Sequence, residues 1–334
     1  IMWGALFPGQ GSQHPGMVKF LFEEFKIARE TFEEASDTLG INFQKLCFDG
    51  TDEELALTKN TQPALVLVST ATSRVLTSLS NFKPIAYAGH SVGEYAALVA
   101  TGALTLPDAL RAVRRRGEAM QEAVPVGEGA MAAVMGLTPI QVVEMCQWAE
   151  KTAAKEGVQS PLEPANFNCP GQIVISGRAT LMQWMLKNFT KEVYQQVFSP
   201  EADGASVSRV KFIPLKVSAP FHCSMMKPAE DTMRALLTET EFKTVATPVV
   251  QNFTAQPTTN ANTLRENVIR QISAPVRWIE CIEQMQDLGA TKFIELGSGK
   301  VLNGLVKKIL GEKATTYPMN SLEELKAVTS LLGI

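Results

Sequence analysis

A serine flanked by glycines is the residue of this chain best suited to covalent chemistry. Gly89-His90-Ser91-Val92-Gly93 follows the short apolar run 85–88 and precedes a helical pattern over 94–100. A G-x-S-x-G pattern between a strand and a helix is typical of a nucleophile elbow, a sharp turn that presents the serine hydroxyl. The turn would place Ser91 at the positive end of the following helix, beside the N–H of Val92. The bare pattern also arises by chance, so it is the strand-turn-helix context that favours a nucleophile over an ordinary turn serine.

The chain has three histidines, and a serine hydroxyl needs a general base at neutral pH. His90 is adjacent to Ser91, and neighbouring side chains diverge on a tight turn, so we expect His90 to pack or to contact the substrate. His14 lies in a loop after the first strand and is interpreted as a solvated loop histidine. His222 follows an expected strand at 212–217, a position where a catalytic base can be displayed. We therefore predict His222 as the base, against the alternative of a satisfied, half-buried histidine.

Acyl transfer also needs two hydrogen-bond donors for the charge that develops on the carbonyl oxygen. We predict the N–H of Val92 as one donor. The loop Gly9-Gln10-Gly11 is a source for the second, because flexible glycines let backbone approach a ligand closely; the alternative is a plain strand-to-helix turn. One arginine of the helix after Pro107 could clamp a substrate carboxylate, while others form i,i+4 pairs with glutamate. The spacing leaves open which one does so: Arg111, Arg114, Arg115 or Arg116.

The glycine-rich segment 297–300 does not fit either nucleotide-binding pattern. A P-loop requires glycine where Glu295 stands and serine or threonine where Val301 stands, and the dinucleotide fingerprint requires glycine where Leu302 stands. We predict instead a turn between a strand at 290–296 and a helix from Val301.

Composition narrows the class of protein. The 334 residues are 45% hydrophobic and 19% charged, which is ordinary for a globular protein, and the net charge of −3 gives no broad attraction for nucleic acid. No run approaches the ~18 apolar residues of a membrane span. Five cysteines without a C-x-x-C pair predict neither a zinc site nor a disulfide framework and favour a reducing, cytoplasmic compartment. The sequons at Asn188 and Asn252 are therefore interpreted as chance matches.

Strand-like runs alternate with helical patterns, which predicts an α/β architecture. The pattern of expected elements changes after Pro125, where a strand-helix-strand-helix-strand block indicates a small α+β subdomain inserted into a larger one. The expected division is a large subdomain of residues 1–126 and 214–334 and a small one of residues 127–213. The block comprises strands at 130–135, 173–176 and 212–217 and helices at 139–155 and 181–189.

Six segments together resemble the malonyl-CoA:acyl-carrier-protein transacylases over nearly the whole chain. They are, in order, FPGQGSQ, GHSVGEY, RRGEAMQEAVPVGEGAM, NFNCPGQIVISG, RQISAPVRW and GSGKVLNGL. The resemblance implies a large α/β-hydrolase-like subdomain with an inserted ferredoxin-like one. It also implies a ping-pong reaction in which malonyl passes from coenzyme A to Ser91 and then to the phosphopantetheine thiol of an acyl carrier protein. Neither a metal nor a bound cofactor is implied.

The same resemblance implies roles for individual residues. The oxyanion donors fall on the backbone of Gln10 and Val92. Arg116 would hold the free malonyl carboxylate, and the main-chain carbonyl of Gln271 would orient His222. A neutral carbonyl in that place would explain why no acidic third member of a triad stands out.

Two departures from the family pattern are visible. Phe221 precedes His222, where many discrete bacterial members have serine; a phenylalanine there resembles the malonyl-selecting domains of multidomain synthases. The region between Asn168 and His222 looks longer than usual because of a polar loop at 199–208.

Two alternative functions remain: an acyl hydrolase of the same fold that removes acyl groups from carrier proteins, and a non-catalytic carrier-protein-binding module. A carboxylate clamp disfavours the first, and an intact serine, histidine and GQG loop disfavour the second.

Overall fold

The computed structural model describes residues 2–199, 209–217 and 219–333, and these form two compact units. The larger unit comprises residues 1–118, 233–268 and 280–334, and the smaller unit comprises residues 119–232 and 269–279. The smaller unit thus extends beyond the expected 127–213. Its boundaries fall inside continuous helices, among them α7 (Leu106–Glu122) and α11 (Lys227–Thr238), where composition gives no signal of a change of unit.

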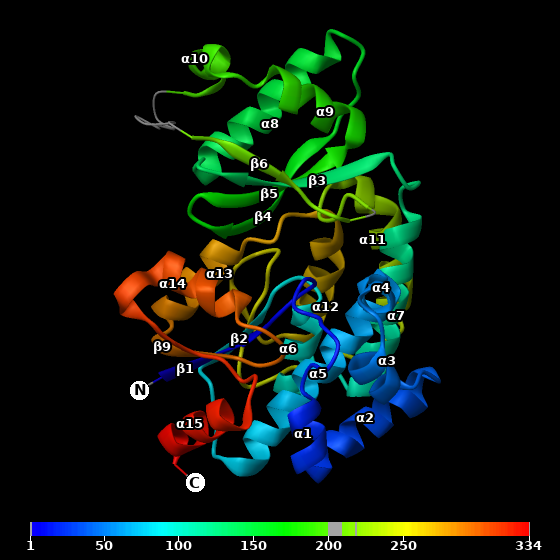
Figure 1. Cartoon of the computed structure of the whole chain (residues 1–334), viewed down its shortest axis with the longest axis vertical. Helices are drawn as coiled ribbons and strands as arrows, with labels where there is room; N and C mark the ends of the chain where they lie inside the picture. The colour runs from blue at the N-terminus through cyan, green and yellow to red at the C-terminus, as the bar shows by residue number, and fades with distance from the viewer. Residues whose placement is uncertain (1, 200–208, 218, 334) are drawn as a thin grey trace. The chain divides into compact units, whose positions relative to one another are not determined.

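The larger unit is built on one sheet whose adjacent strands are parallel except for the last pair. The strand order is β10 (Thr315–Tyr317), β9 (Ala290–Glu295), β1 (Met2–Phe7), β2 (Ala86–Gly89), β7 (Val249–Val250) and β8 (Pro257–Thr258) (Figure 1). Strand β1 is a central strand, and Ala5, Leu6 and Phe7 are fully buried. A continuous apolar run of this kind is what a parallel strand covered on both faces requires. The predicted α/β architecture is therefore confirmed.

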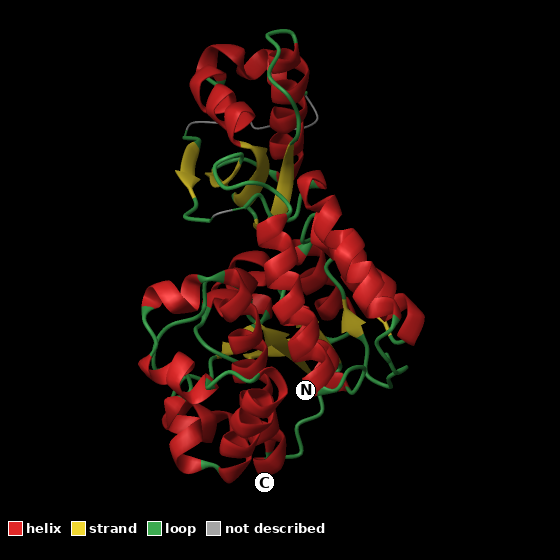
Figure 2. Ribbon diagram, turned by 90° about the vertical axis from the view of Figure 1, so that its right-hand side faces the viewer, coloured by secondary structure: helices red, strands yellow, loops and turns green. Residues whose placement is uncertain are grey.

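Helices enclose the strands of the larger unit (Figure 2). Helix α6 (Gly93–Thr101) contacts β1, β2 and β7, and α5 (Thr58–Leu79) packs against α6. The remaining helices here are α1 (Lys19–Glu24), α2 (Lys26–Leu39), α3 (Phe43–Asp49), α4 (Asp52–Ala56), α12 (Ala261–Arg270), α13 (Trp278–Asp287), α14 (Val301–Leu310) and α15 (Leu322–Leu332), of which α12 and α13 continue into the smaller unit.

The smaller unit holds a four-stranded antiparallel sheet with α8 (Pro139–Ala154) and α9 (Ala179–Asn188) packed on it. Its strand order is β4 (Leu162–Cys169), β5 (Gln172–Arg178), β3 (Gly129–Met135) and β6 (Lys211–Pro214). The three predicted strands are present, with β6 ending three residues earlier than expected. The sequence missed β4, because its Glu163, Pro164 and two asparagines interrupt the apolar alternation by which a strand is recognised.

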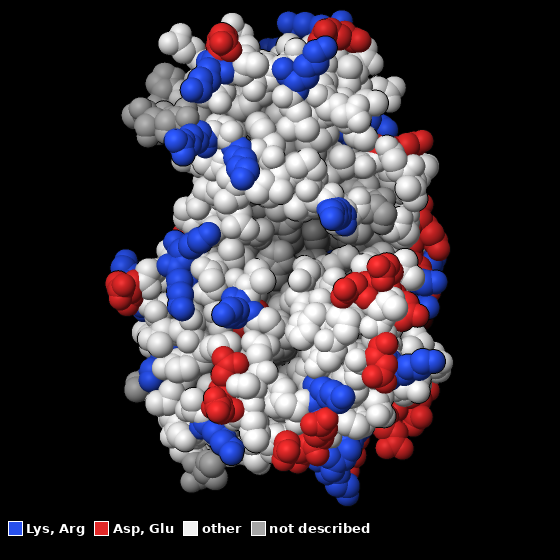
Figure 3. All heavy atoms as spheres, viewed as in Figure 1, with Lys and Arg blue, Asp and Glu red and all other residues white. Residues whose placement is uncertain are grey.

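No helix within the described residues is long and apolar enough to cross a membrane. On the face drawn in Figure 3, Lys and Arg side chains of the larger unit alternate with Asp and Glu. This agrees with the small net charge of −3. Nearly all of the polar loop expected at 199–208 lies outside the described residues, which resume at 209.

Candidate active site

Ser91 occupies a sharp turn between β2 and α6, as the sequence predicted. Its φ of +52° lies in the left-handed region, which costs a residue other than glycine roughly 1 to 3 kcal/mol. Both flanking glycines are sterically required. A Cβ at Gly89 would lie 2.0 Å from the backbone carbon of Gly93, and a Cβ at Gly93 would lie 2.2 Å from the carbonyl oxygen of Phe7. Gly89 thus lets the turn close on itself, and Gly93 lets the turn pack tightly against the end of β1.

The buried side chain of Asn252 holds the backbone of this turn on both sides. Its Oδ1 accepts the N–H of Ser91 at 2.8 Å, and its Nδ2 donates to the carbonyl of Gly89 at 2.8 Å. The backbone N–H of Asn252 donates to Oε1 of Glu94, in the first turn of α6, and both residues are fully buried. Sequence reasoning missed the roles of Asn252 and Glu94, since no sequence pattern links either residue to the turn at Ser91.

Of the four arginines on α7, it is Arg116 that reaches the serine. Its Nη2 donates to Oγ of Ser91 at 3.2 Å and its Nη1 donates to Oε1 of Gln62 at 2.7 Å. The guanidinium also lies 5.8 Å from the centre of the Tyr95 ring. The other three form partly exposed pairs with Asp108 and Glu118, namely Arg111, Arg114 and Arg115.

Burial gives Arg116 an unusual electrostatic setting. It is only 1% exposed, and desolvation lowers its pKa from the ordinary value, while Tyr95 and Glu94 oppose that shift. Desolvation also raises the pKa of Tyr95 to about 12, so that ring stays a neutral phenol. A desolvated cation is stabilised more by a bidentate anion than a solvent-exposed cation is. The position therefore suits the recognition of a carboxylate next to Ser91.

The loop that carries Gln10 lies against the elbow. A Cβ at Gly9 would lie 2.5 Å from the carbonyl oxygen of His90. The loop is closed by Ser12, whose Oγ donates to the carbonyl of Gly9 at 2.9 Å. Within the part of the chain that the structure describes, no acceptor takes the N–H of Gln10 or of Val92. Both amides are thus available for an oxyanion, the role that the sequence predicts for them.

His222 and Gln271 lie together in the smaller unit. Nδ1 of His222 is 3.0 Å from the carbonyl oxygen of Gln271, and both residues are buried. An Nδ1–H donated to this carbonyl leaves the lone pair on Nε2, the tautomer that a general base requires. The backbone of His222 is left-handed, with φ of +58°, and the preceding Phe221 is 7% exposed.

Three other sequence-predicted features have a clear position. His90 is partly exposed, and its backbone N–H donates to the carbonyl of Phe7. His14 is exposed in its loop, as expected. Segment 297–300 is a turn between β9 and α14, as predicted, and Asn320 bonds both the N–H and the carbonyl of Gly299. That turn is also attached to the Gln10 loop, since Ser298 Oγ donates to the carbonyl of Ser12 at 2.9 Å.

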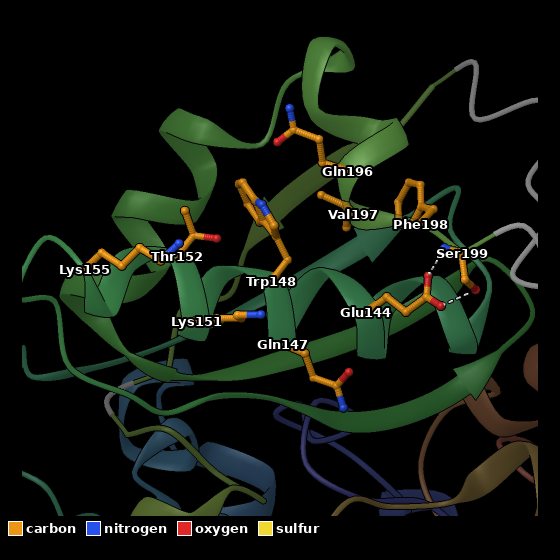
Figure 4. A pocket seen from close by; sticks show the side chains of 10 residues that line it. All are labelled: Glu144, Gln147, Trp148, Lys151, Thr152, Lys155, Gln196, Val197, Phe198 and Ser199. Carbon is orange, nitrogen blue, oxygen red and sulfur yellow. Dashed lines mark hydrogen bonds between the residues drawn. The ribbon is translucent and has the colours of Figure 1, made fainter.

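A shallow pocket of about 620 Å³ lies elsewhere, between α8 and α10 (Tyr194–Val197) of the smaller unit. Figure 4 shows Trp148 and Phe198 at its wall and Glu144 bonded to Ser199. None of the residues predicted for catalysis lines this pocket. The structure thus groups the predicted residues as Ser91 with Arg116 in the larger unit and His222 with Gln271 in the smaller one.

The chain resembles known acyltransferases over almost its whole length. Residues 5–327 match the acyl transferase domain family. The malonyl CoA-acyl carrier protein transacylase of Bacillus subtilis is 43% identical over 304 residues, which make up 91% of this chain and 89% of that protein. An acyl carrier protein S-malonyltransferase structure from Vibrio cholerae is 38% identical with a TM-score of 0.87, covering 98% of this chain and 100% of that one. A chain from the structure of a type II PKS acyl-carrier protein in complex with its malonyl-transacylase is 36% identical with a TM-score of 0.87, covering 99% and 100%. The chain therefore belongs to the acyl transferase domain family, among the malonyl CoA-acyl carrier protein transacylases.

Proposed function

We propose that this protein transfers a malonyl group from coenzyme A to the phosphopantetheine thiol of an acyl carrier protein, through a malonyl ester of Ser91. The observation that carries the proposal is the buried guanidinium of Arg116, 3.2 Å from the Ser91 hydroxyl. The names of the relatives agree in substrate and partner.

In the first half-reaction the thioester carbon of malonyl-CoA is attacked by Oγ of Ser91. His222 takes the hydroxyl proton on Nε2, while the carbonyl of Gln271 stabilises the imidazolium through Nδ1–H. The oxyanion of the tetrahedral intermediate accepts the N–H groups of Gln10 and Val92. When the carbon–sulfur bond breaks, coenzyme A leaves as a thiol with the proton that His222 had taken.

The second half-reaction runs the same steps in reverse with another thiol. The phosphopantetheine thiol of the carrier protein gives its proton to His222 and attacks the malonyl ester. The intermediate collapses, the ester bond breaks, and Oγ of Ser91 regains the proton from His222. Ser91, His222 and the two backbone N–H groups account for every bond and proton in these steps, so we propose that the reaction requires neither a metal nor a bound cofactor.

Selection for malonyl follows from what the acyl group carries at its far end. Malonyl has a carboxylate one methylene beyond the reacting carbonyl, and a malonyl ester on Ser91 would bring that carboxylate to Arg116. Two partners of Arg116, Gln62 Oε1 and Ser91 Oγ, are neutral oxygens, and a carboxylate is a stronger acceptor than either. An acetyl group offers the guanidinium no such acceptor. We propose His90 and Phe221 as further contacts to the substrate.

The finer description of the fold is also a proposal. We regard the larger unit as α/β-hydrolase-like and the smaller as ferredoxin-like. The strand-elbow-helix at Ser91 and the parallel sheet support the first assignment. The order of strands and helices, β3-α8-β4-β5-α9-β6, supports the second. A cytoplasmic location is favoured by five cysteines that are all buried and form no disulfide.

Intact mass spectrometry tests the function directly. After brief incubation with malonyl-CoA we expect a malonyl adduct that persists in buffer and moves to holo carrier protein when this is added. The Ser91→Ala variant should form no adduct. An adduct that decays to free malonate without a carrier would indicate the hydrolase instead, and a chain that never reacts while still binding the carrier would indicate a non-catalytic module.

A further inference from the structure

The nucleophile elbow is fixed by a side chain that arrives from a distant part of the larger unit. Strand β7 pairs in parallel with β2, with Val249 opposite Tyr87. Asn252 follows β7 just as Ser91 follows β2, so the two residues leave adjacent strands at the same edge of the sheet. The carboxamide of Asn252 then bonds the carbonyl of Gly89 and the N–H of Ser91, at 2.8 Å each.

These contacts hold the turn at both ends. Gly89 and Ser91 flank His90, so one amide group fixes the backbone that enters the elbow and the backbone that leaves it. The N–H of Asn252 is in turn held by Glu94, and the N–H of Glu94 donates to the carbonyl of Ser91 at 3.1 Å. Ser91, Asn252 and Glu94 thus form a closed ring of hydrogen bonds, in which Asn252 and Glu94 are fully buried and Ser91 is partly buried.

The ring determines which backbone amide can face an acyl group. The N–H of Ser91 is directed to Asn252, whereas no described residue accepts the N–H of Val92. We infer that Asn252 is a positioning residue, which holds Ser91 in its left-handed conformation and leaves the Val92 N–H as the elbow's oxyanion donor. The inference rests on the proposed acyl transfer through Ser91. It gives a role in that reaction to Asn252, which lies 161 positions from Ser91 in the sequence.

The adjacent Gln251 provides a matched control. It is also fully buried and also makes two amide bonds, to the carbonyl of Leu264 at 3.0 Å and from Nδ2 of Asn267 at 2.9 Å. Neither bond reaches the elbow. Replacing either amide by alanine removes two buried hydrogen bonds of the same kind, so a purely structural effect should be similar in the two variants.

The experiment compares Asn252→Ala and Gln251→Ala in single-turnover acylation by malonyl-CoA, with the adduct counted by intact mass per folded molecule. We expect Asn252→Ala to lower the maximal acylation rate ten- to a thousandfold while the malonyl-CoA concentration at half-maximal rate changes less than threefold. Gln251→Ala should lower the thermal midpoint comparably and keep the rate within threefold of the parent. Equal rates in the two variants, or a loss confined to apparent affinity, would overturn the inference.

A milder variant covers the case in which Asn252→Ala does not fold. Asn252→Ser keeps one polar group but cannot span both Gly89 and Ser91, and we expect at least a fivefold loss of rate with apparent affinity retained. A folded Asn252→Ser variant that acylates at the parental rate would refute the positioning role. Failure of the underlying function has a different signature and appears before any change at Asn252: the parent protein would form no stable malonyl adduct, or Ser91→Ala would still acquire one.

Discussion

The Nη2 of Arg116 lies 3.2 Å from the Oγ of Ser91, although 25 residues separate them in the chain. The contact joins a cation that is 1% exposed to the hydroxyl proposed as nucleophile. Gln62 holds the other terminal nitrogen at 2.7 Å, so the guanidinium is fixed before any substrate is present. An arginine set in place in advance pays little conformational entropy when a carboxylate reaches it.

The first prediction concerns acyl selection. Arg116→Ala should lower kcat/KM for malonyl-CoA about a hundredfold, since truncating one partner of a buried charged pair costs roughly 2 to 5 kcal/mol. The rate with acetyl-CoA should change much less, so the preference between the two thioesters should collapse. This preference is measured by competition between malonyl-CoA and acetyl-CoA, with the two adducts distinguished by intact mass. Arg116→Lys keeps the charge but not the bidentate geometry, so its kcat/KM for malonyl-CoA should lie between the values of the parent and of Arg116→Ala. A malonyl preference that survives in Arg116→Ala would place the clamp elsewhere.

The second prediction concerns the base. His222→Ala should slow acylation by Ser91 about 10² to 10⁴-fold, the usual contribution of a general base. His14 supplies the control, because it is an exposed histidine outside the proposed chemistry. His14→Ala should acylate at the parental rate. Single-turnover rates over a range of pH measure both variants, and a parental rate in a folded His222→Ala protein would remove His222 from the mechanism.

The third prediction concerns the loop that carries Gln10. Ser298 donates to the carbonyl of Ser12, so Ser298→Ala should loosen the loop and lower the acylation rate about threefold to thirtyfold without changing the apparent affinity for malonyl-CoA. Ser78 makes the same kind of bond, to the carbonyl of Val75 at 2.7 Å, near the end of α5. Ser78→Ala should leave the rate unchanged, and equal rates in the two variants would mean that the Ser298 bond does not support the oxyanion loop.

The fourth prediction concerns a buried carboxyl and pH. Desolvation raises the pKa of Glu295 from its ordinary 4.5 to about 7, although two N–H groups of α14 lower it in part. The folded chain binds this proton more tightly than the unfolded chain. Its contribution to stability is therefore complete below pH 4.5 and is lost as the pH rises through 7.

Replacing Glu295 by glutamine removes that dependence. The unfolding free energy of Glu295→Gln, relative to the parent, should rise between pH 4.5 and pH 8 by at most on the order of 3 kcal/mol. Urea unfolding at several pH values measures the change. A difference that stays constant across this range would show that Glu295 titrates normally in the folded protein.

The sequence predicted the elbow and the smaller unit's main elements because each depends on neighbours in the chain. The start of α5 shows where such local reasoning fails. Pro63 argues against a helix at that point, yet α5 begins at Thr58 with Pro63 inside it. Proline leaves the carbonyl of Lys59 without its usual N–H partner, and Nη1 of Arg114 donates to that carbonyl at 2.9 Å. A helix from elsewhere thus repairs the break and brings Gln62 to Arg116.

The role of Asn252 could not be predicted from the sequence either. In the sequence it reads only as the first residue of a sequon, whereas in the structure it is fully buried with both amide atoms bonded, so a glycan could not be attached to the folded chain. A polar residue next to a two-residue strand gives no periodic signal. Its role depends on the pairing of β7 with β2, which the sequence does not encode locally.

The order of strands in the larger unit has a consequence for how the protein is made. Both neighbours of the β1–β2 pair, β9 and β7, come from beyond residue 248. A ribosome adding about 5 to 20 residues per second needs roughly 8 to 32 s to go from Ser91 to Asn252. During that interval the growing chain carries its serine on a turn that nothing yet clamps, with two strand edges open to other partners. A ribosome-bound chain stopped before Asn252 should therefore be inert towards malonyl-CoA, and only synthesis of the segments that follow residue 251 converts it into an acyl acceptor.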